Sequence, residues 1–377
     1  MNKFYNPVKV CQGYGAVKNL SEVIKELDIQ RGNILFLIWN ECIIENKDIK
    51  AVIAENSNIE FKTIIFTKSN PDTEDLFRLY METKNEDFSL VVAIGGGSVM
   101  DMGKSLCCLY GNTINSEEEL RQGIKGNAFV KPGCKWVGVP TTAGTGSEVT
   151  CWATVWNNIE NSKLSLESKY NYAYAALADP QFASTMPVSL AVSSALDAAA
   201  HATEAYWAKT SNFISKTYSL RAISLIMNNI MDLFDEDRQE AAHNYMSRGS
   251  VFAGLAFSNT KTTACHSLSY PLTLKYHIPH GTAVSMLIEP VMKVNLEIVD
   301  GKEDLLSAYG VKSIDELGSK IKSILQYAGI PDRLHLWGAE REEIAELAVS
   351  CRTKGRIDNN PVDLSEETIV NILNSIF

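Results

Sequence analysis

Residues 90–104, Leu-Val-Val-Ala-Ile-Gly-Gly-Gly-Ser-Val-Met-Asp-Met-Gly-Lys, decide the fold. The apolar run predicts a buried strand, and the glycines that follow it predict a tight turn into a helix. At such a turn the backbone approaches a diphosphate closely, and the free N–H groups of the new helix bind it. Met100 stands where the third glycine of the dinucleotide fingerprint would fall, so a plain tight connection stays the alternative.

The segments around this turn extend the same pattern through the first half of the chain. Three further apolar runs predict buried strands, at residues 34–38, 61–66 and 136–139. Helical segments at 20–27 and 74–83 alternate with them, which is typical of a parallel sheet covered by helices. After about residue 185 only helical periodicity remains, at 190–208, 216–233, 238–256, 317–328 and 341–349. We predict an α/β nucleotide-binding half, 1–185, and an all-α half, 186–377.

Composition narrows the classes of partner. The chain has 377 residues and a formal net charge of −10, which disfavours nucleic acid and anionic membranes as partners. Because no window approaches the roughly 18 apolar residues of a membrane helix and the N-terminus has no apolar signal core, we expect a cytoplasmic protein. The eight cysteines include no C-x-x-C pair, so we expect reduced and mostly buried thiols instead of disulfides or a zinc knot.

A second polar loop follows the strand that ends at Pro140. Residues 141–150 read Thr-Thr-Ala-Gly-Thr-Gly-Ser-Glu-Val-Thr. This density of hydroxyls and glycines suits a polar ligand better than core packing. A helix N-cap, notably at Ser147, is the alternative.

Acidic and histidine side chains in the second half have the spacing of metal ligands. Asp197 and His201 stand four residues apart, so a helix places both on one face. His266 and His280 form a second pair. One oxygen and three nitrogens suit Fe²⁺ or Zn²⁺ with a position left open for substrate. For any single histidine, a satisfied core residue is the alternative.

The other histidines are less informative. His243 lies among charged residues and His335 follows a polar turn, so we expect both to be solvated or structural. His277 is close to His280 in sequence and is a candidate to support the ligands from behind.

Together these motifs resemble the iron-containing alcohol dehydrogenases, in order from residues 13–15 to 359–361. The resemblance implies a Rossmann-like N-terminal domain, a helical C-terminal domain, and a cleft between them that holds NAD or NADP and a divalent ion, Fe²⁺ or Zn²⁺. It implies Asp197, His201, His266 and His280 as metal ligands that take part in catalysis. The cofactor-binding residues it implies are Asn40, Asn70, Gly96, Gly97, Ser98, Asp101, Thr141, Thr142, Thr145 and Lys163.

The sequence departs from better-known family members in two places. Tyr270 stands where many have a further histidine, and it is a catalytic candidate through its hydroxyl, or an aromatic wall. After the strand at 34–38, Asn40 tolerates a ribose phosphate whereas Glu41 repels one, so the choice between NAD and NADP stays open.

A narrower resemblance concerns the substrate. Residues 153–156, 204–207 and 258–271 are similar to the phosphonoacetaldehyde reductase branch, whose reaction yields 2-hydroxyethylphosphonate. Asn259 and Lys261 would offer donors to a phosphonate, and a helix end with a solvated lysine is the alternative. A second basic group, expected to be exposed, consists of Arg352, Lys354 and Arg356.

The expected activity is metal-dependent hydride transfer between nicotinamide and an aldehyde or alcohol, by a homodimer or higher homo-oligomer. Three alternatives remain from the sequence. They are a short-chain primary alcohol dehydrogenase of the butanol or propanediol type, a lyase resembling dehydroquinate synthase, and a non-catalytic sensor of nucleotide or metal. Net NAD(P)H consumption separates the reductase from the lyase.

Overall fold

The computed structural model describes residues 3–160, 162–353 and 355–377, so Lys354 of the second basic group lies outside the described residues. Contacts divide the chain into two compact units. We call Asn6–Thr142 with Ser147–Ala183 the sheet unit, and Met1–Tyr5, Ala143–Gly146 and Ser184–Phe377 the helical unit. The assignment of nucleotide binding to residues 1–185 and metal binding to 186–377 stays a prediction.

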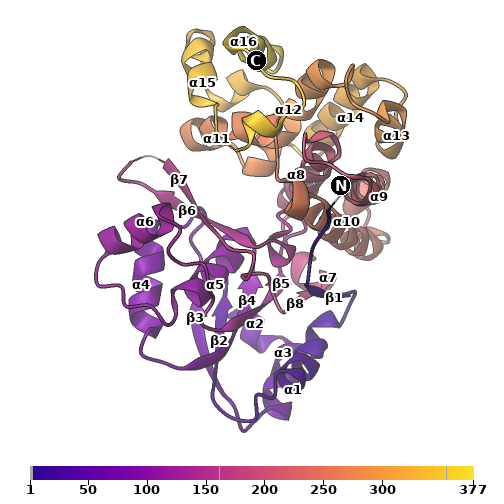
Figure 1. The fold of residues 1–377 in the computed structure, drawn as a ribbon. Coiled ribbons are helices and arrows are strands. Elements are labelled where there is room, and N and C mark those ends of the chain that lie inside the picture. Colours follow the sequence, from indigo (N-terminus) through magenta and orange to yellow (C-terminus); the bar gives the residue numbers. More distant parts are fainter. Residues whose placement is uncertain (1–2, 161, 354) are drawn as a thin grey trace. The chain divides into compact units, whose positions relative to one another are not determined.

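The sheet unit is built on a parallel sheet of six strands, in the order β1-β8-β5-β4-β2-β3 (Figure 1). The strands are β1 Lys9–Gln12, β2 Asn33–Ile38, β3 Glu60–Ile65, β4 Phe88–Gly95, β5 Lys135–Pro140 and β8 Ala175–Ala178. The four predicted strands are present, and the mixed fold class is confirmed. The burial predicted for residues 61–66 is wrong, because β3 lies at the edge of the sheet and only Ile64 of this strand is buried. Ile38 pairs with Ile94, and Gly95 pairs with Pro140. The loops that follow β2, β4 and β5 therefore leave the same edge of the sheet, where ligands of such sheets bind.

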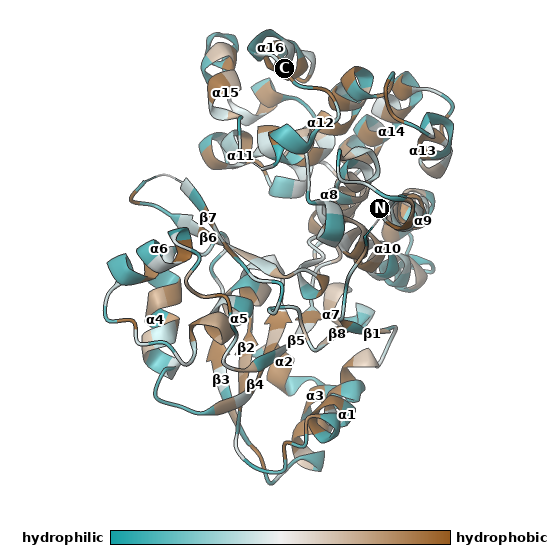
Figure 2. Cartoon of the chain, viewed as in Figure 1, coloured by the Kyte–Doolittle hydropathy of each residue, from teal (hydrophilic) through white to brown (hydrophobic). Residues whose placement is uncertain are grey.

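Helices cover both faces of this sheet, and alternate strand residues pack against each face. Leu35 and Val91 belong to one apolar core, whereas Ile34 and Val92 belong to the other. Figure 2 shows the apolar strands between the helices. The helices are α1 Leu20–Glu26, α2 Cys42–Glu45, α3 Lys47–Glu55, α4 Thr73–Thr83, α5 Gly97–Leu109, α6 Glu117–Lys125 and α7 Pro180–Ala183, with short 3₁₀ turns at Ala16–Asn19 and Ser147–Val149.

A separate antiparallel hairpin, β6 Trp152–Asn157 and β7 Ser162–Glu167, was not expected from the sequence. Lys163 lies on β7, opposite Trp156. Both strands have only six residues, which is too short for a clear alternation of polar and apolar residues, so their sequences did not predict them.

The helical unit packs around α8, which is Val188–Trp207. The small side chains of Ala195, Ala198, Ala199 and Ala202 are buried and let neighbouring helices approach closely. The other helices are α9 Phe213–Asn229, α10 Gln239–Thr260, α11 Ala264–Tyr276, α12 His280–Asn295, α13 Lys302–Ala308, α14 Ile314–Tyr327, α15 Ile344–Ser350 and α16 Glu366–Ser375. Short 3₁₀ turns occur at Ile230–Phe234, Leu334–Trp337, Arg341–Glu343 and Ile357–Asn359.

The five helical segments predicted after residue 185 are present, but α11, α12, α13 and α16 were missed. Two of the missed helices contain an internal proline, Pro271 in α11 and Pro290 in α12. Proline normally interrupts a helix because it lacks an N–H and clashes with the preceding turn. Here the surrounding core keeps both helices intact, which a local pattern does not reveal.

Several smaller expectations also meet the structure. His243 is buried in α10, so it is a structural residue as one of the two predictions had it, and the prediction of a solvated side chain is wrong. His335 is exposed. All eight cysteines are free thiols, as predicted, although Cys42 is exposed. Among the residues that the structure describes, no helix is long and apolar enough to cross a membrane.

Candidate metal centre and nucleotide loops

Three of the four predicted metal ligands form one buried cluster in the helical unit. Asp197 and His201 project from the same face of α8, and His266 projects from α11. His266 Nε2 lies 3.5 Å from Asp197 Oδ1, and His201 Nδ1 lies 3.8 Å from Asp197 Oδ2. The ligand atoms that the three side chains offer lie within 4.8 Å of one another, which is the spacing of groups that share one ion.

His280 stands at the edge of this cluster. It is the first residue of α12, its Nε2 lies 4.0 Å from Asp197 Oδ1, and 37% of its side chain is exposed. Gly281 makes this approach feasible, because a Cβ there would lie 2.1 Å from the carbonyl oxygen of Ser193 on α8. The structure thus brings the three predicted histidine ligands around the carboxylate of the fourth, Asp197, and His280 is the most accessible of them.

The cluster passes a test for a bound cation. Asp197 Oδ1, His201 Nδ1 and His266 Nε2 are buried and have no hydrogen-bond partner among the described residues. Buried polar atoms are rarely left in that state without a reason. An oxygen and imidazole nitrogens are a donor set for Fe²⁺ or Zn²⁺, so the residues fit a divalent ion.

The electrostatics of the cluster favour a cation. Burial opposes ionisation of Asp197, but His201, His266 and His280 outweigh it and hold the pKa of this carboxyl well below its usual range. Burial lowers the pKa of His201 to about 3, so its imidazole is neutral and has a lone pair to donate. The pKa of His266 is raised to about 10, because Glu204 and Asp197 outweigh the effect of burial.

Glu204 is a functional candidate that sequence reasoning missed. It is fully buried on α8, and its carboxylate contacts His266 Nδ1 and accepts a 2.8 Å hydrogen bond from Thr263 Oγ1. Trp207 Nε1 in turn donates to Thr263 Oγ1 at 2.8 Å. Nδ1 of His266 is thereby engaged, and Nε2 is left to face Asp197. Glu204 lies two helical turns after Asp197, on the face of α8 that also carries His201, and this spacing is the signal that could have found it.

Aromatic rings enclose two of the histidines. Phe257 of α10 stacks on His201, with ring centroids 4.3 Å apart and 15° between the planes. Tyr270 is nearly parallel to His280, at 5.8 Å and 6°. The sequence did not indicate Phe257. For Tyr270 the stacking favours the aromatic wall among its two predicted roles, and a role for its hydroxyl stays a prediction.

Part of the polar loop at residues 141–150, which we call the threonine loop, belongs to the helical unit. A Cβ on Gly144 would lie 2.7 Å from the carbonyl oxygen of Ser194, and one on Gly146 would lie 2.6 Å from Gly254 Cα. Gly146 also has φ of 56°, a conformation that favours glycine. Thr145 is therefore seated beside α8 and α10, while Thr141 and Thr142 remain with the sheet unit.

The glycine turn after β4 has the form of an anion site. Gly96 is the N-cap residue of α5. Because glycine has no side chain, it leaves the N–H groups of Gly97 and Ser98 without a side-chain cap. A Cβ on Gly96 would lie 3.4 Å from the methyl carbon of Thr142. Thr142 Oγ1 is buried and has no partner among the described residues. A buried hydroxyl without a partner, next to a helix start without a side-chain cap, supports the prediction that this turn, which we call the cradle, binds a phosphate.

Behind the cradle, α5 is tied to the threonine loop by a buried network. Asp101 accepts hydrogen bonds from Ser147 Oγ at 2.7 Å and from the Thr154 N–H at 2.8 Å. Lys104 is fully buried and donates to Ser147 O, Ser147 Oγ, Thr150 Oγ1 and Trp152 O. Asp101 therefore has a clear structural task, and its contact with nucleotide stays a prediction. Lys104 as the centre of this network was missed.

The remaining predicted nucleotide residues lie on separate segments of the sheet unit. Asn40 follows β2, and its Oδ1 accepts from the Cys42 N–H at 2.9 Å. Asn70 is exposed after β3, with φ of 52°. Lys163 is half-buried on the hairpin. Which of them contacts nucleotide stays a prediction.

Of the predicted substrate residues, Asn259 lies in the last turn of α10 and Lys261 directly follows that helix, five residues before His266. Asn259 Oδ1 accepts from the Tyr5 N–H at 2.8 Å, and Lys261 follows α10 with φ of 62°. The Thr260 carbonyl accepts hydrogen bonds from Thr210 Oγ1 and Asn359 Nδ2. This segment is thus fixed at its backbone. His277 is exposed and ends α11 in a left-handed conformation, which gives it a helix-ending task.

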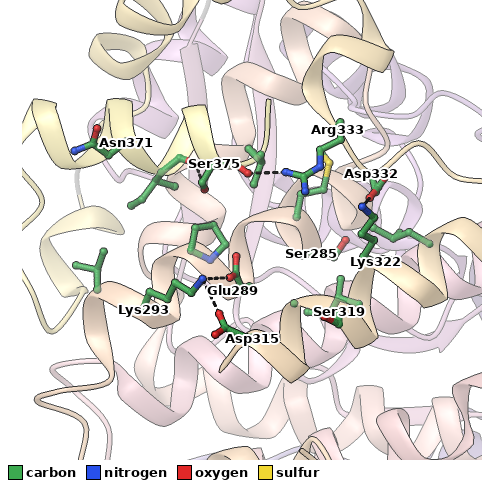
Figure 3. A pocket seen from close by; sticks show the side chains of 18 of the residues that line it. Ser285, Glu289, Lys293, Asp315, Ser319, Lys322, Asp332, Arg333, Asn371 and Ser375 are labelled. Carbon is green, nitrogen blue, oxygen red and sulfur yellow. Dashed lines mark hydrogen bonds and ion pairs between the residues drawn. The ribbon is translucent and has the colours of Figure 1, made fainter. Parts of the chain in front are cut away.

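A cavity of about 710 Å³ in the helical unit is separate from the four ligands (Figure 3). It lies along residues 285–294 of α12, together with α14 and α16. Figure 3 shows Lys293 paired with Glu289 and Asp315, and Arg333 donating to the Ser375 carbonyl. None of the four ligands is among its lining residues, so its size does not mark the chemistry.

Comparisons with known proteins show the family of the chain. The iron-containing alcohol dehydrogenase family matches residues 7–180, and the C-terminal part of the Fe-containing alcohol dehydrogenase family matches residues 191–377. The chain is 29% identical to 4-hydroxybutyrate dehydrogenase of Clostridium kluyveri, over 94% of this chain and 95% of that protein. It is 24% identical to sulfoacetaldehyde reductase of Bilophila wadsworthia, over 99% and 98%.

A solved structure has the same fold. The sulfoacetaldehyde reductase of Bifidobacterium kashiwanohense, in complex with NAD⁺, aligns with a TM-score of 0.87 and 24% identity, over 100% of this chain and 98% of that chain. Two family matches that together span nearly the whole sequence decide the assignment. The chain belongs to the iron-containing alcohol dehydrogenase family and is an oxidoreductase of that family.

Proposed function

We propose that the chain is an NAD(P)H-linked reductase of short aldehydes that carry an anionic group, with phosphonoacetaldehyde as its substrate and 2-hydroxyethylphosphonate as its product. The proposal of an anionic substrate rests on residues 259–261. Asn259 Nδ2 is buried and has no partner among the described residues, and Lys261 lies two residues further, on a backbone that Thr210 and Asn359 hold. The names of two relatives support an acidic substrate, since 4-hydroxybutyrate and sulfoacetaldehyde both carry an acid group.

When bound, the divalent ion would supply a Lewis acid for the carbonyl oxygen, and the nicotinamide would supply the hydride. The task of the chain is to hold both groups. Asp197, His201, His266 and His280 would hold the ion, with the more exposed His280 facing the side from which substrate arrives. Glu204 fixes the ring of His266, as carboxylates do behind metal-bound histidines. Iron is the first choice by family, and zinc stays open.

Nucleotide binding is proposed for the sheet unit. The N–H groups of Gly97 and Ser98 and the hydroxyl of Thr142 would bind the diphosphate, while Asp101 and Lys104 keep the two loops in place. Asn40 and Glu41 follow β2 where an adenosine ribose binds in related sheets. The pair does not decide between NAD and NADP.

The rings of Phe257 and Tyr270 have a supporting task. Stacked on His201 and His280, they exclude water from two sides of the ligand cluster, which strengthens electrostatic interactions there. A role for the Tyr270 hydroxyl in passing a proton to the product oxygen stays a prediction. Replacement with Phe tests this, because the ring is kept and only the hydroxyl is lost.

The experiment that tests the substrate is an NADH and NADPH oxidation screen with Fe²⁺ or Zn²⁺, comparing butyraldehyde, lactaldehyde, sulfoacetaldehyde and phosphonoacetaldehyde. We expect phosphonoacetaldehyde to have the highest kcat/KM. Lys261→Met should raise KM for phosphonoacetaldehyde at least tenfold, since a charge-assisted hydrogen bond contributes about 1.5–3 kcal/mol. The same variant should leave KM for butyraldehyde unchanged. Equal preference for butyraldehyde in the wild type would contradict the proposal.

The aromatic walls favour a second candidate, a dehydrogenase of short uncharged primary alcohols of the butanol or propanediol type. The screen separates it directly, because an uncharged aldehyde would then be preferred and Lys261→Met would have no effect. A homodimer or higher homo-oligomer also stays a prediction, and light scattering on the purified protein tests it.

A further inference from the structure

Two cysteines outside the metal centre lie in contact within the sheet unit. Cys134 precedes β5 and Cys107 lies near the end of α5, and their sulfur atoms are 3.5 Å apart. Disulfide sulfurs are about 2.05 Å apart, so the thiols need to approach by only about 1.5 Å. They come from segments separated by 27 positions, so the fold and not the sequence brings them together.

The backbone around the pair fixes this contact. The Gly133 N–H donates to the Cys107 carbonyl at 2.7 Å. Gly133 has no side chain to prevent this approach, since a Cβ there would lie 2.5 Å from the Tyr110 carbonyl oxygen. On the other side of Cys134, the Lys135 carbonyl lies 3.8 Å from Cys107 Sγ. Cys107 is therefore held between the residues that flank Cys134.

The two thiols differ in accessibility. Cys134 is half-buried and lines a cavity of about 370 Å³, together with charged residues that include Lys84, Glu86 and Asp87. Cys107 is buried and does not line it. A small oxidant that enters this cavity meets Cys134 first, with Cys107 directly behind it. Redox-sensitive cysteines commonly have this arrangement of an accessible thiol and a neighbouring resolving thiol.

We propose that Cys134 and Cys107 form a peroxide-oxidisable dithiol site. The Cys134 thiolate attacks hydrogen peroxide, the O–O bond breaks, and Cys134 sulfenic acid and hydroxide form. The Cys107 sulfur then attacks the Cys134 sulfur, the S–O bond breaks, and the oxygen leaves as water with the proton of Cys107. In total two thiols and one peroxide give one disulfide and two waters. A dithiol reductant reverses the reaction.

The site would join α5 to the entry of β5. The predicted nucleotide residues lie at the opposite ends of these elements, with Gly97 at the start of α5 and Thr141 just after β5. The bond would thus brace the two elements of the cradle without occupying it. This inference does not rest on the proposed substrate, because no residue of the metal cluster takes part.

The test is sulfur connectivity in the intact protein. Zinc-loaded protein, which carries no redox-active metal, is treated with hydrogen peroxide and denatured, and free thiols are alkylated. A digest without reductant is then analysed by mass spectrometry. We expect a peptide pair joined through Cys107 and Cys134, two hydrogens lighter than the reduced pair, and its disappearance after treatment with dithiothreitol.

Variants assign the order of events. In Cys107→Ser we expect Cys134 to stop at the sulfenic acid, which dimedone captures. In Cys134→Ser we expect Cys107 to stay alkylatable. Cys108→Ser is the matched control, because Cys108 is a buried neighbour on α5 and its loss should leave the linked pair intact. The proposal is wrong if Cys134 pairs with Cys108, or if both thiols stay reduced at a peroxide dose that fully oxidises the exposed Cys42.

Discussion

Gly281→Ala should disrupt the proposed metal centre without touching a ligand. The new Cβ would lie 2.1 Å from the Ser193 carbonyl oxygen, and real Cβ atoms essentially never come closer than 3.0 Å to a neighbour. Because the obstacle is backbone, the start of α12 must move from α8 by about 0.9 Å. His280 immediately precedes this position, and metal sites tolerate distance errors of about 0.2 Å. We expect metal affinity to fall at least tenfold, about 1.4 kcal/mol.

The same change should also weaken the fold. Forcing a methyl group into a packed contact costs about 1–3 kcal/mol, of which the better helix propensity of alanine recovers up to about 1 kcal/mol. Isothermal titration of the metal-free protein with Zn²⁺ measures affinity, and urea unfolding measures stability. Gly318→Ala is the control, because its Cβ would meet the movable side chain of Glu289 at 2.8 Å. Unchanged metal affinity in Gly281→Ala, with α12 still folded, would refute the reasoning.

Three further predictions concern buried charge. Glu204→Gln keeps the shape but removes the carboxylate behind His266, and we expect a 10–100-fold loss of Zn²⁺ affinity by titration, which an unchanged affinity would contradict. Burial raises the pKa of Glu148 to about 7, from 4.5, so its protonated form is favoured in the folded state. The contribution of Glu148 to stability should therefore be greatest below pH 4.5 and fall by about 3 kcal/mol as pH rises to 7, and Glu148→Gln should remove this contribution from a pH series of urea unfolding curves. Removal of metal with EDTA should lower the thermal midpoint, and Zn²⁺ at 100 times its Kd should restore about 2.7 kcal/mol, an effect that His266→Ala should abolish.

Much of the fold follows from local patterns in the sequence. The strands β2 and β4 are long apolar runs, β3 and β5 contain shorter ones, and α8 is a long run of mostly small apolar residues, so these elements could be predicted. The edge strand β1 and the strand β8 have only four residues each, too few for a pattern. Proline hid α11 and α12, because the tertiary packing that tolerates Pro271 and Pro290 lies outside any local window.

The site divides in the same way. Asp197 and His201 share a helical face, so their proximity could be derived from spacing alone. Phe257 reaches the same place through the packing of α10 against α8, and a single sequence carries no sign of that packing. The position of Glu204 could be derived from its spacing to Asp197, but its contact with His266 depends on how α11 packs. Lys104 reads as an ordinary end of a glycine motif, yet four hydrogen bonds make it the centre of a buried network.

Gly144 and Gly146 pack against α8 and α10, and this contact affects whether the two halves of the chain could be separated. A protein cut at residue 185 would separate Ser184–Phe377 from Ala143–Gly146, four residues that pack with it. The cut fragment would expose the hollow beside Ser194 and Gly254 that these glycines fill. Autonomous folding of the C-terminal half is therefore not expected, although its helices form a continuous apolar core. Exchange of either half alone between related proteins would separate this loop from the helices that it packs against, because the loop belongs by sequence to the N-terminal half.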